Sequence, residues 1–126
     1  MADSQQKAVY AWEHQWRDWT CQNTSQAQLR KVIRSAERLY RVPPALIQFR
    51  SKNKNDAGVP LPSSYYAYGV MALRPQHNNI AVALHETAHA IMNHLFGWEP
   101  KGMEDHGPQW LGIYLYLLER FKVAPR

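Results

Sequence analysis

Three observations predict an α+β fold for this chain, with helices packed on a small sheet of two or three strands. Apolar residues recur at helical spacing in four segments. Two segments between them show either the alternation or the aromatic content of strands. The chain has 126 residues, of which 45% are hydrophobic, and this is enough for one modest core. We therefore expect a single domain over residues 1–126.

The first third of the chain, residues 4–41, is predicted to form two helices. In the first helix, over residues 4–19, three tryptophans recur at helical spacing and are expected to pack in the core: Trp12, Trp16 and Trp19. The second helix begins at a cap on Thr24 or Ser25 and ends before two consecutive prolines. Its apolar face consists of Leu29, Val32, Ile33, Ala36, Leu39 and Tyr40.

The opposite face of the second helix is basic. It carries Arg30, Lys31, Arg34, Arg38 and Arg41. One interpretation is a solvated outer face whose charge is relieved in part by Glu37; the other is a contact with nucleic acid or another anionic partner. The net charge of +5 permits the second interpretation without establishing it.

Residues 45–74 are predicted to form the sheet and a long loop. Residues 45–50 alternate between apolar and polar side chains, which is typical of a strand. Residues 51–64 are rich in Asn, Gly, Pro and Ser and predict a loop. Residues 64–73 are aromatic-rich and predict a second strand beside the following helix.

The next helix, over residues 79–96, carries the motif that dominates the sequence. Asn78 or Asn79 caps its start and Gly97 ends it. His85 and His89 are four residues apart, so their side chains lie on one side of the helix, roughly 40° apart around its axis. Two imidazoles placed in this way can share one zinc ion, with Glu86 beside it as general base. Residues at helical spacing would bury one flank of the helix: Ile80, Leu84, Ala88, Ile91 and Leu95.

A catalytic zinc usually has three protein ligands and one water, so a third ligand is needed. His94 is excluded because it points roughly 140° away from His89 on the same helix. His106 is preferred because it lies in a turn that leads directly into the last helix; Glu104 and Asp105 are alternatives. That helix, predicted over residues 108–122, begins with a proline and has a core-facing stripe. The stripe consists of Trp110, Ile113, Tyr114, Leu117, Leu118 and Phe121. Two tyrosines of this helix, Tyr114 and Tyr116, are candidates for an outer contact at the metal site, but packing in the core or on the surface is the favoured role of both.

These motifs resemble those of SprT-like zinc metallopeptidases, and most of all those of small single-domain metallohydrolases of actinobacteria and their phages. The matching residues are His85, Glu86, His89, His106, Gly107 and Trp110. The resemblance implies a zincin-like core in which three histidines hold one zinc ion and Glu86 acts as the base. The zinc ribbon of longer SprT-like proteins has no counterpart here, because Cys21 is the only cysteine.

The sequence therefore predicts a zinc-dependent hydrolase that acts on a protein or peptide substrate. The alternative is a catalytically weak or inactive zinc-bearing module that binds nucleic acid or a partner protein through its basic second helix. The N-terminus lacks a signal-peptide core, and no apolar run approaches the roughly 20 residues that span a bilayer. We therefore expect a cytoplasmic protein with no membrane segment.

Overall fold

The structure is a computed structural model that describes residues 8, 24–52, 54–59, 64–67, 69–74, 79–97 and 107–121. Its elements are α2 (Gln26–Tyr40), β1 (Leu46–Phe49), β2 (Tyr65–Ala67), β3 (Val70–Leu73), α3 (Ile80–Phe96) and α4 (Pro108–Arg120). The predicted α+β class is confirmed, with three described helices and a three-stranded sheet. The predicted helix over residues 4–19, with its three tryptophans, lies outside the described residues except for Ala8. No described helix has the length and hydrophobicity that crossing a bilayer requires.

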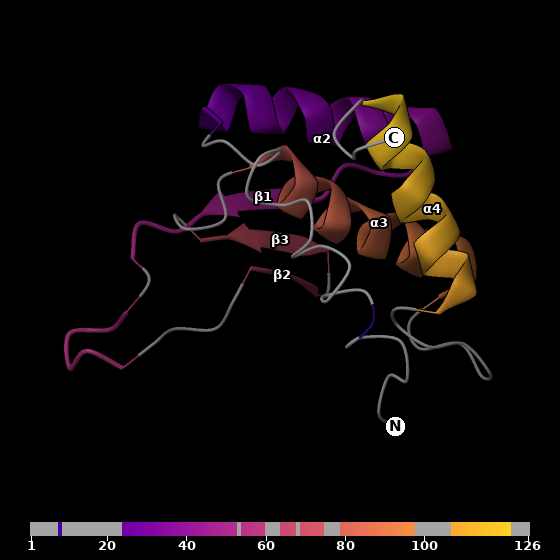
Figure 1. The fold of residues 1–126 in the computed structure, drawn as a ribbon. Coiled ribbons are helices and arrows are strands. Elements are labelled where there is room, and N and C mark those ends of the chain that lie inside the picture. Colours follow the sequence, from indigo (N-terminus) through magenta and orange to yellow (C-terminus); the bar gives the residue numbers. More distant parts are fainter. Residues whose placement is uncertain are drawn as a thin grey trace.

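The sheet has the strand order β1-β3-β2, with β3 parallel to β1 and antiparallel to β2. The prediction of one strand over residues 64–73 is therefore wrong, because this segment forms a hairpin. Ala67 pairs with Val70, so only two residues connect the strands. One of them is Gly69, whose φ of 81° lies in the left-handed region that tight hairpin turns require. The described part of the predicted loop, up to residue 59, extends away from the sheet (Figure 1).

Helix α2 is fixed at both ends by local hydrogen bonds. The Ser25 hydroxyl accepts a hydrogen bond from the backbone N–H of Gln28 at 3.2 Å and caps the first turn. At the other end Arg41 adopts a left-handed conformation with φ 55°, which directs backbone N–H groups to the carbonyls of Glu37 and Arg38. The predicted start and end of this helix are thereby confirmed.

A buried carboxylate joins α2 to the start of β1. Glu37 is 2% exposed and accepts hydrogen bonds from the Arg34 guanidinium and from the backbone N–H of Ala45, each at 2.7 Å. Arg34 also donates to the Ala45 carbonyl at 2.9 Å. The predicted partial relief of the basic face by Glu37 is therefore confirmed for Arg34, one of its five cations. The Glu37 side chain is directed inward, where it accepts a hydrogen bond from the backbone N–H of Ala45, a buried group that would otherwise have no partner.

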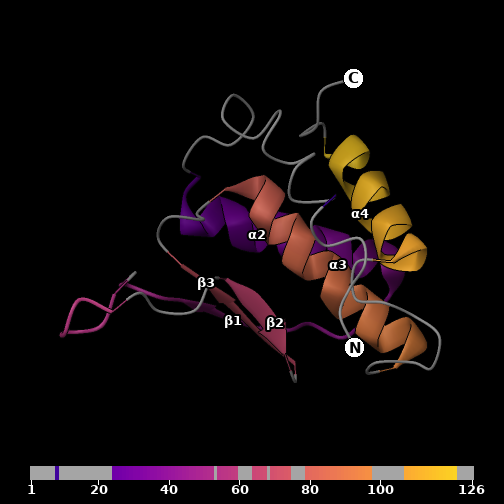
Figure 2. The same cartoon turned by 60° about the horizontal axis from the view of Figure 1, so that its bottom comes forward.

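Helix α3 is the centre of the molecule. Figures 1 and 2 show it between the sheet and α4, with α2 lying across both α3 and the sheet. One core cluster lies between the three helices and includes Val32, Leu84, Ile91, Trp110 and Leu117. The other lies between α2, α3 and the sheet and includes Leu29, Ile33, Ile47, Met71 and Val82. Each large side chain buried in this way stabilises the fold by about 1.5–3 kcal/mol.

Two residues predicted for the core are exposed instead. Leu39 is 42% exposed and Leu95 is 48% exposed. Leu95 lies in the last turn of α3, where His94 and Phe96 are also exposed, so this turn extends beyond its packing partners. Helical spacing correctly identifies the apolar side of each helix, but it contains no information on where the neighbouring element ends.

Candidate metal centre

The histidine-bearing helix has the predicted bounds and caps. The Asn79 side chain accepts a hydrogen bond from the backbone N–H of Val82 at 2.8 Å, a cap that contributes about 1 kcal/mol. Gly97 ends the helix with φ 84°. Between them, the Thr87 hydroxyl donates to the Ala83 carbonyl at 2.6 Å and is fully buried. The motif therefore stands on a regular, well-capped helix in the core.

His85 and His89 lie side by side, as their spacing predicts. Their ring centres are 5.1 Å apart and the ring planes are inclined at 63°. An imidazole bound to zinc has its centre roughly 3.2 Å from the ion, and two such rings at a tetrahedral angle lie about 5.2 Å apart. The observed separation thus suits two imidazoles that share one ion.

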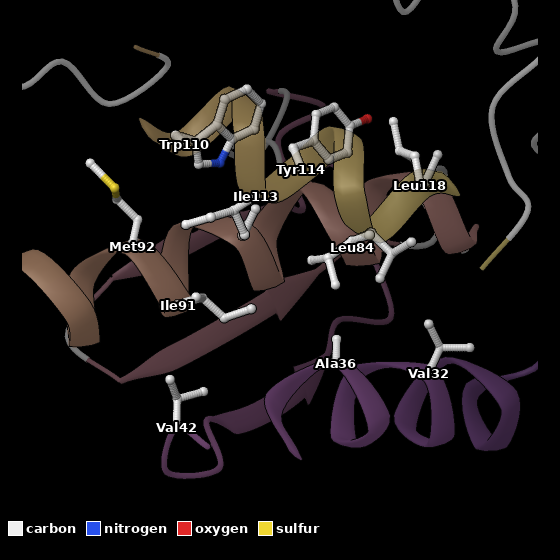
Figure 3. Packing of buried hydrophobic residues seen from close by; sticks show 13 residues of the cluster. Val32, Ala36, Val42, Leu84, Ile91, Met92, Trp110, Ile113, Tyr114 and Leu118 are labelled. Carbon is white, nitrogen blue, oxygen red and sulfur yellow. The ribbon is translucent and has the colours of Figure 1, made fainter. Parts of the chain in front are cut away.

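Helix α4 forms an aromatic wall along this pair. The Trp110 ring stacks on His89 at 5.0 Å and meets His85 edge to face at 4.7 Å. Tyr114 stacks on Trp110 at 4.8 Å and lies 5.2 Å from His85. Both aromatic side chains are fully buried, and Figure 3 shows them projecting from α4 over α3. The predicted core stripe of α4 is therefore also the wall of the histidine site.

Of the two candidate tyrosines, Tyr114 is the one that lies beside His85. Tyr116 lies on the other side of α4, is exposed, and packs edge to face against Tyr40 of α2 at 6.2 Å. Which of the two meets His85 follows from how α4 is rotated against α3. The sequence carries one relevant signal: Tyr114 follows Trp110 by four residues, so the two share a helix face.

Glu86 follows His85 on α3 and is 7% exposed, about as buried as His85 at 6%. His94 is exposed in the last turn of the helix, away from the wall. The candidates for the third ligand, His106, Glu104 and Asp105, lie outside the described residues. Within the described ranges no group of three His, Cys, Asp or Glu side chains could hold a metal ion. A complete three-ligand site would therefore take its third donor from outside these ranges.

Comparison with known proteins returns no match: no family model, no curated protein and no solved structure is similar to this chain. A function has to be assigned from the chemistry of the site itself.

Proposed function

We propose that this protein is a zinc-dependent hydrolase of the zincin type, and most specifically a peptidase. The observation that carries the proposal is the pair His85 and His89, whose ring separation of 5.1 Å suits one shared zinc ion. Glu86, a buried carboxylate on the same helix, is the base that such a site requires. The resemblance of the motifs to SprT-like peptidases supports the same assignment.

In this proposal His85, His89 and His106 hold the ion, with Glu104 or Asp105 as the alternative third ligand. Support for a donor at this point of the chain comes from α4. Its N-cap is Gly107, the residue that directly follows His106 in the chain. Three residues later Trp110 contacts both imidazoles. A side chain immediately before Gly107 is therefore close in the chain to the wall of the site.

Bound zinc would lower the pKa of a water molecule towards about 7 and polarise the scissile carbonyl. Glu86 would accept the proton of the attacking water and return it to the leaving nitrogen. Its burial supports this role, because a carboxylate shielded from bulk water exchanges protons with the reacting groups rather than with solvent. The wall formed by Trp110 and Tyr114 would exclude water from one side of the histidine pair.

Strand β2 is the element best suited to bind an extended substrate. It is an edge strand of the sheet and it contacts α3. An edge strand can pair through its backbone with an added peptide strand, which gives affinity independent of the peptide's sequence. This arrangement supports a peptide as the substrate.

The decisive variant is Glu86→Gln, tested with purified protein on casein and on fluorogenic peptides. Loss of the base should reduce turnover by about 10²–10⁴-fold, whereas bound zinc, measured by elemental analysis, should remain at one ion per chain. His94→Ala removes an exposed histidine of the same helix and should preserve both turnover and zinc. A Glu86→Gln protein that hydrolyses peptides at the parent rate would exclude Glu86 as the base.

The rival function is a zinc-bearing module without hydrolytic activity. Structural zinc sites usually have four protein ligands, several of them cysteines, and this chain has one cysteine. The ligand chemistry therefore favours catalysis. A parent protein that binds one zinc ion but cleaves neither casein nor any member of a peptide library would support the rival.

A further inference from the structure

The outer face of α2 is a cationic surface that the proposed hydrolase does not use. Its exposed cations are Arg30, Lys31, Arg38 and Arg41. With roughly 100° per residue, all four fall within about 100° of the helix circumference, and they extend over about 16 Å of its length. We call these four residues the α2 cationic face.

No acidic side chain compensates this face on its own helix. Glu37 is the only acidic residue of α2, and its carboxylate is buried against Arg34 and Ala45. Arg34 is thereby paired and serves as a structural cation, with 33% of its side chain still exposed. In the described part of the chain, Lys31 and Arg41 make no side-chain hydrogen bond or ion pair, and Arg38 bonds only to Ser35. The four charges are therefore available to an external partner.

The apolar face of α2 is already occupied. Leu29, Val32, Ile33 and Ala36 are buried in the two core clusters, and Figure 3 shows Val32 and Ala36 directed towards α3. A helix that lies in a membrane interface must insert an apolar face into the lipid. Because α2 has no such face left, its attraction to a partner has to be electrostatic, which favours a polyanion of high charge density.

Two of the four cations show features beyond simple exposure. The Arg30 guanidinium lies over the Phe49 ring at 5.1 Å, a contact of about 0.5–1 kcal/mol, and the residue remains exposed. Arg41 is the only residue other than glycine with positive φ in the described part of the chain. Glycine is the usual residue at this left-handed helix end. An exposed arginine therefore stands at a position whose backbone favours glycine.

We propose that the α2 cationic face binds the phosphodiester backbone of nucleic acid. Three of its four cations are arginines, whose planar guanidinium groups donate paired hydrogen bonds to phosphate oxygens. Gln26 lies one helical turn before Arg30, is exposed, and offers a further donor of the kind that phosphate contacts use. Duplex nucleic acid carries one charge per roughly 1.7 Å of its axis, so several phosphates lie opposite a face of this length. The proposal does not depend on the hydrolase activity.

The test is fluorescence anisotropy with a labelled 20-base-pair duplex and a 20-nucleotide single strand, titrated at several salt concentrations. The test variant replaces Arg30, Lys31 and Arg38 by Gln. The matched control replaces three exposed cations elsewhere, Lys52, Lys54 and Arg120, by Gln. Each variant has a net charge of +2, three below the parent's +5, so total charge cannot distinguish them.

The test variant should bind roughly tenfold more weakly or worse at low salt. Its slope of log K against log salt on the duplex should be shallower by about 2.7, the value for three lost phosphate contacts. The control should stay within about threefold of the parent. Equal losses in both variants would overturn the proposal, as would a parent that binds neither nucleic acid at low salt. Tighter binding to phosphatidylserine vesicles than to either nucleic acid would overturn it in favour of a lipid surface.

Arg41→Gly gives a second, independent readout. Because glycine suits the left-handed backbone at this position, the variant should melt no lower than the parent, and yet it should bind nucleic acid more weakly. Unchanged binding by Arg41→Gly would show that Arg41 is not part of the nucleic-acid-binding surface of the α2 cationic face. The same titrations with Glu86→Gln should reproduce the parent's affinity, so failure of the hydrolase proposal and failure of this one are distinguishable.

Discussion

Trp110 contacts both imidazoles of the histidine pair and therefore couples the packing of α4 to the geometry of the site. It stacks on His89 and meets His85 edge to face. Aromatic contacts of this kind contribute about 0.5–1.5 kcal/mol each and also restrict the planes of the rings involved. Hydrogen-bonding partners that orient metal-binding histidines commonly change metal affinity by about 10–100-fold when removed, and a stacked ring restrains the same ring planes. We therefore regard Trp110 as a positioning residue of the proposed zinc site.

Trp110→Ala should weaken zinc binding by about tenfold or more and lower the free energy of unfolding by about 3–5 kcal/mol. Trp110→Phe retains an aromatic ring and should recover most of the affinity. The matched control is Leu118→Ala, which opens a cavity in the same cluster two turns further along α4. Zinc affinity is measured by competition with a chromogenic chelator, on samples that circular dichroism shows to be folded. If Leu118→Ala lost as much affinity as Trp110→Ala, the effect would be general destabilisation and not ring positioning.

Helices α2 and α4 contact each other through Tyr40 and Tyr116, and folding changes the pKa of Tyr40. Burial, and secondarily the neighbouring Tyr116, raises the pKa of Tyr40 above its ordinary value of 10.0. The folded protein therefore holds this proton at pH values at which the unfolded chain releases it. It follows that the free energy of unfolding falls as pH rises above 10, until the folded-state pKa is reached.

Tyr40→Phe should remove this part of the alkaline destabilisation. Its melting temperature should fall less steeply than that of the parent between pH 9 and about 11. Tyr116→Phe removes only the smaller cause of the shift, so it should retain most of the parent's slope. Melting curves followed by circular dichroism at several pH values provide the measurement. Identical slopes for the parent and Tyr40→Phe would show that Tyr40 titrates alike in the folded and unfolded chains.

The sequence predicted elements well where the signal is local. Asn79 and Gly97 determine the ends of α3, and both act through hydrogen bonds or backbone conformations within a few residues. The sequence does not predict the hairpin of β2 and β3, because the aromatic run is continuous across its turn. Gly69, which has a positive φ, is the one residue that indicates a turn there. The exposure of Leu39 and Leu95 was not predictable, since it depends on where neighbouring elements end.

The candidate site also combines local features, which the sequence predicts, with contacts between elements, which it does not. The four-residue spacing of His85 and His89 follows from helix geometry, so the sequence predicted that they would lie together. Their contacts with Trp110 and Tyr114 join elements more than twenty residues apart, and depend on how α4 is rotated against α3. Periodicity predicted that these aromatic residues face the core. It could not predict which core residues they meet.

For the molecule as a whole, α3 shares one core cluster with α2 and α4 and another with α2 and the sheet. A zinc ion held between α3 and the segment before α4 would add a further connection between these elements. Because an unfolded chain does not hold the ligands in place, binding energy at such a site also stabilises the fold. The melting temperature would therefore report on which residues hold a bound zinc ion.

Adding zinc at about 100 times its dissociation constant should stabilise the parent by about 2.7 kcal/mol, which corresponds to a rise in melting temperature of about 10 °C. EDTA should abolish the rise. His85→Ala and His106→Ala should lose it, because each removes a ligand, whereas His94→Ala, which removes an exposed histidine of the same helix, should retain it. Differential scanning calorimetry measures these shifts. If His106→Ala kept the rise while Glu104→Ala or Asp105→Ala lost it, the third ligand would be that carboxylate. A rise that persisted in both His85→Ala and His106→Ala would place the ion elsewhere and contradict the proposed site.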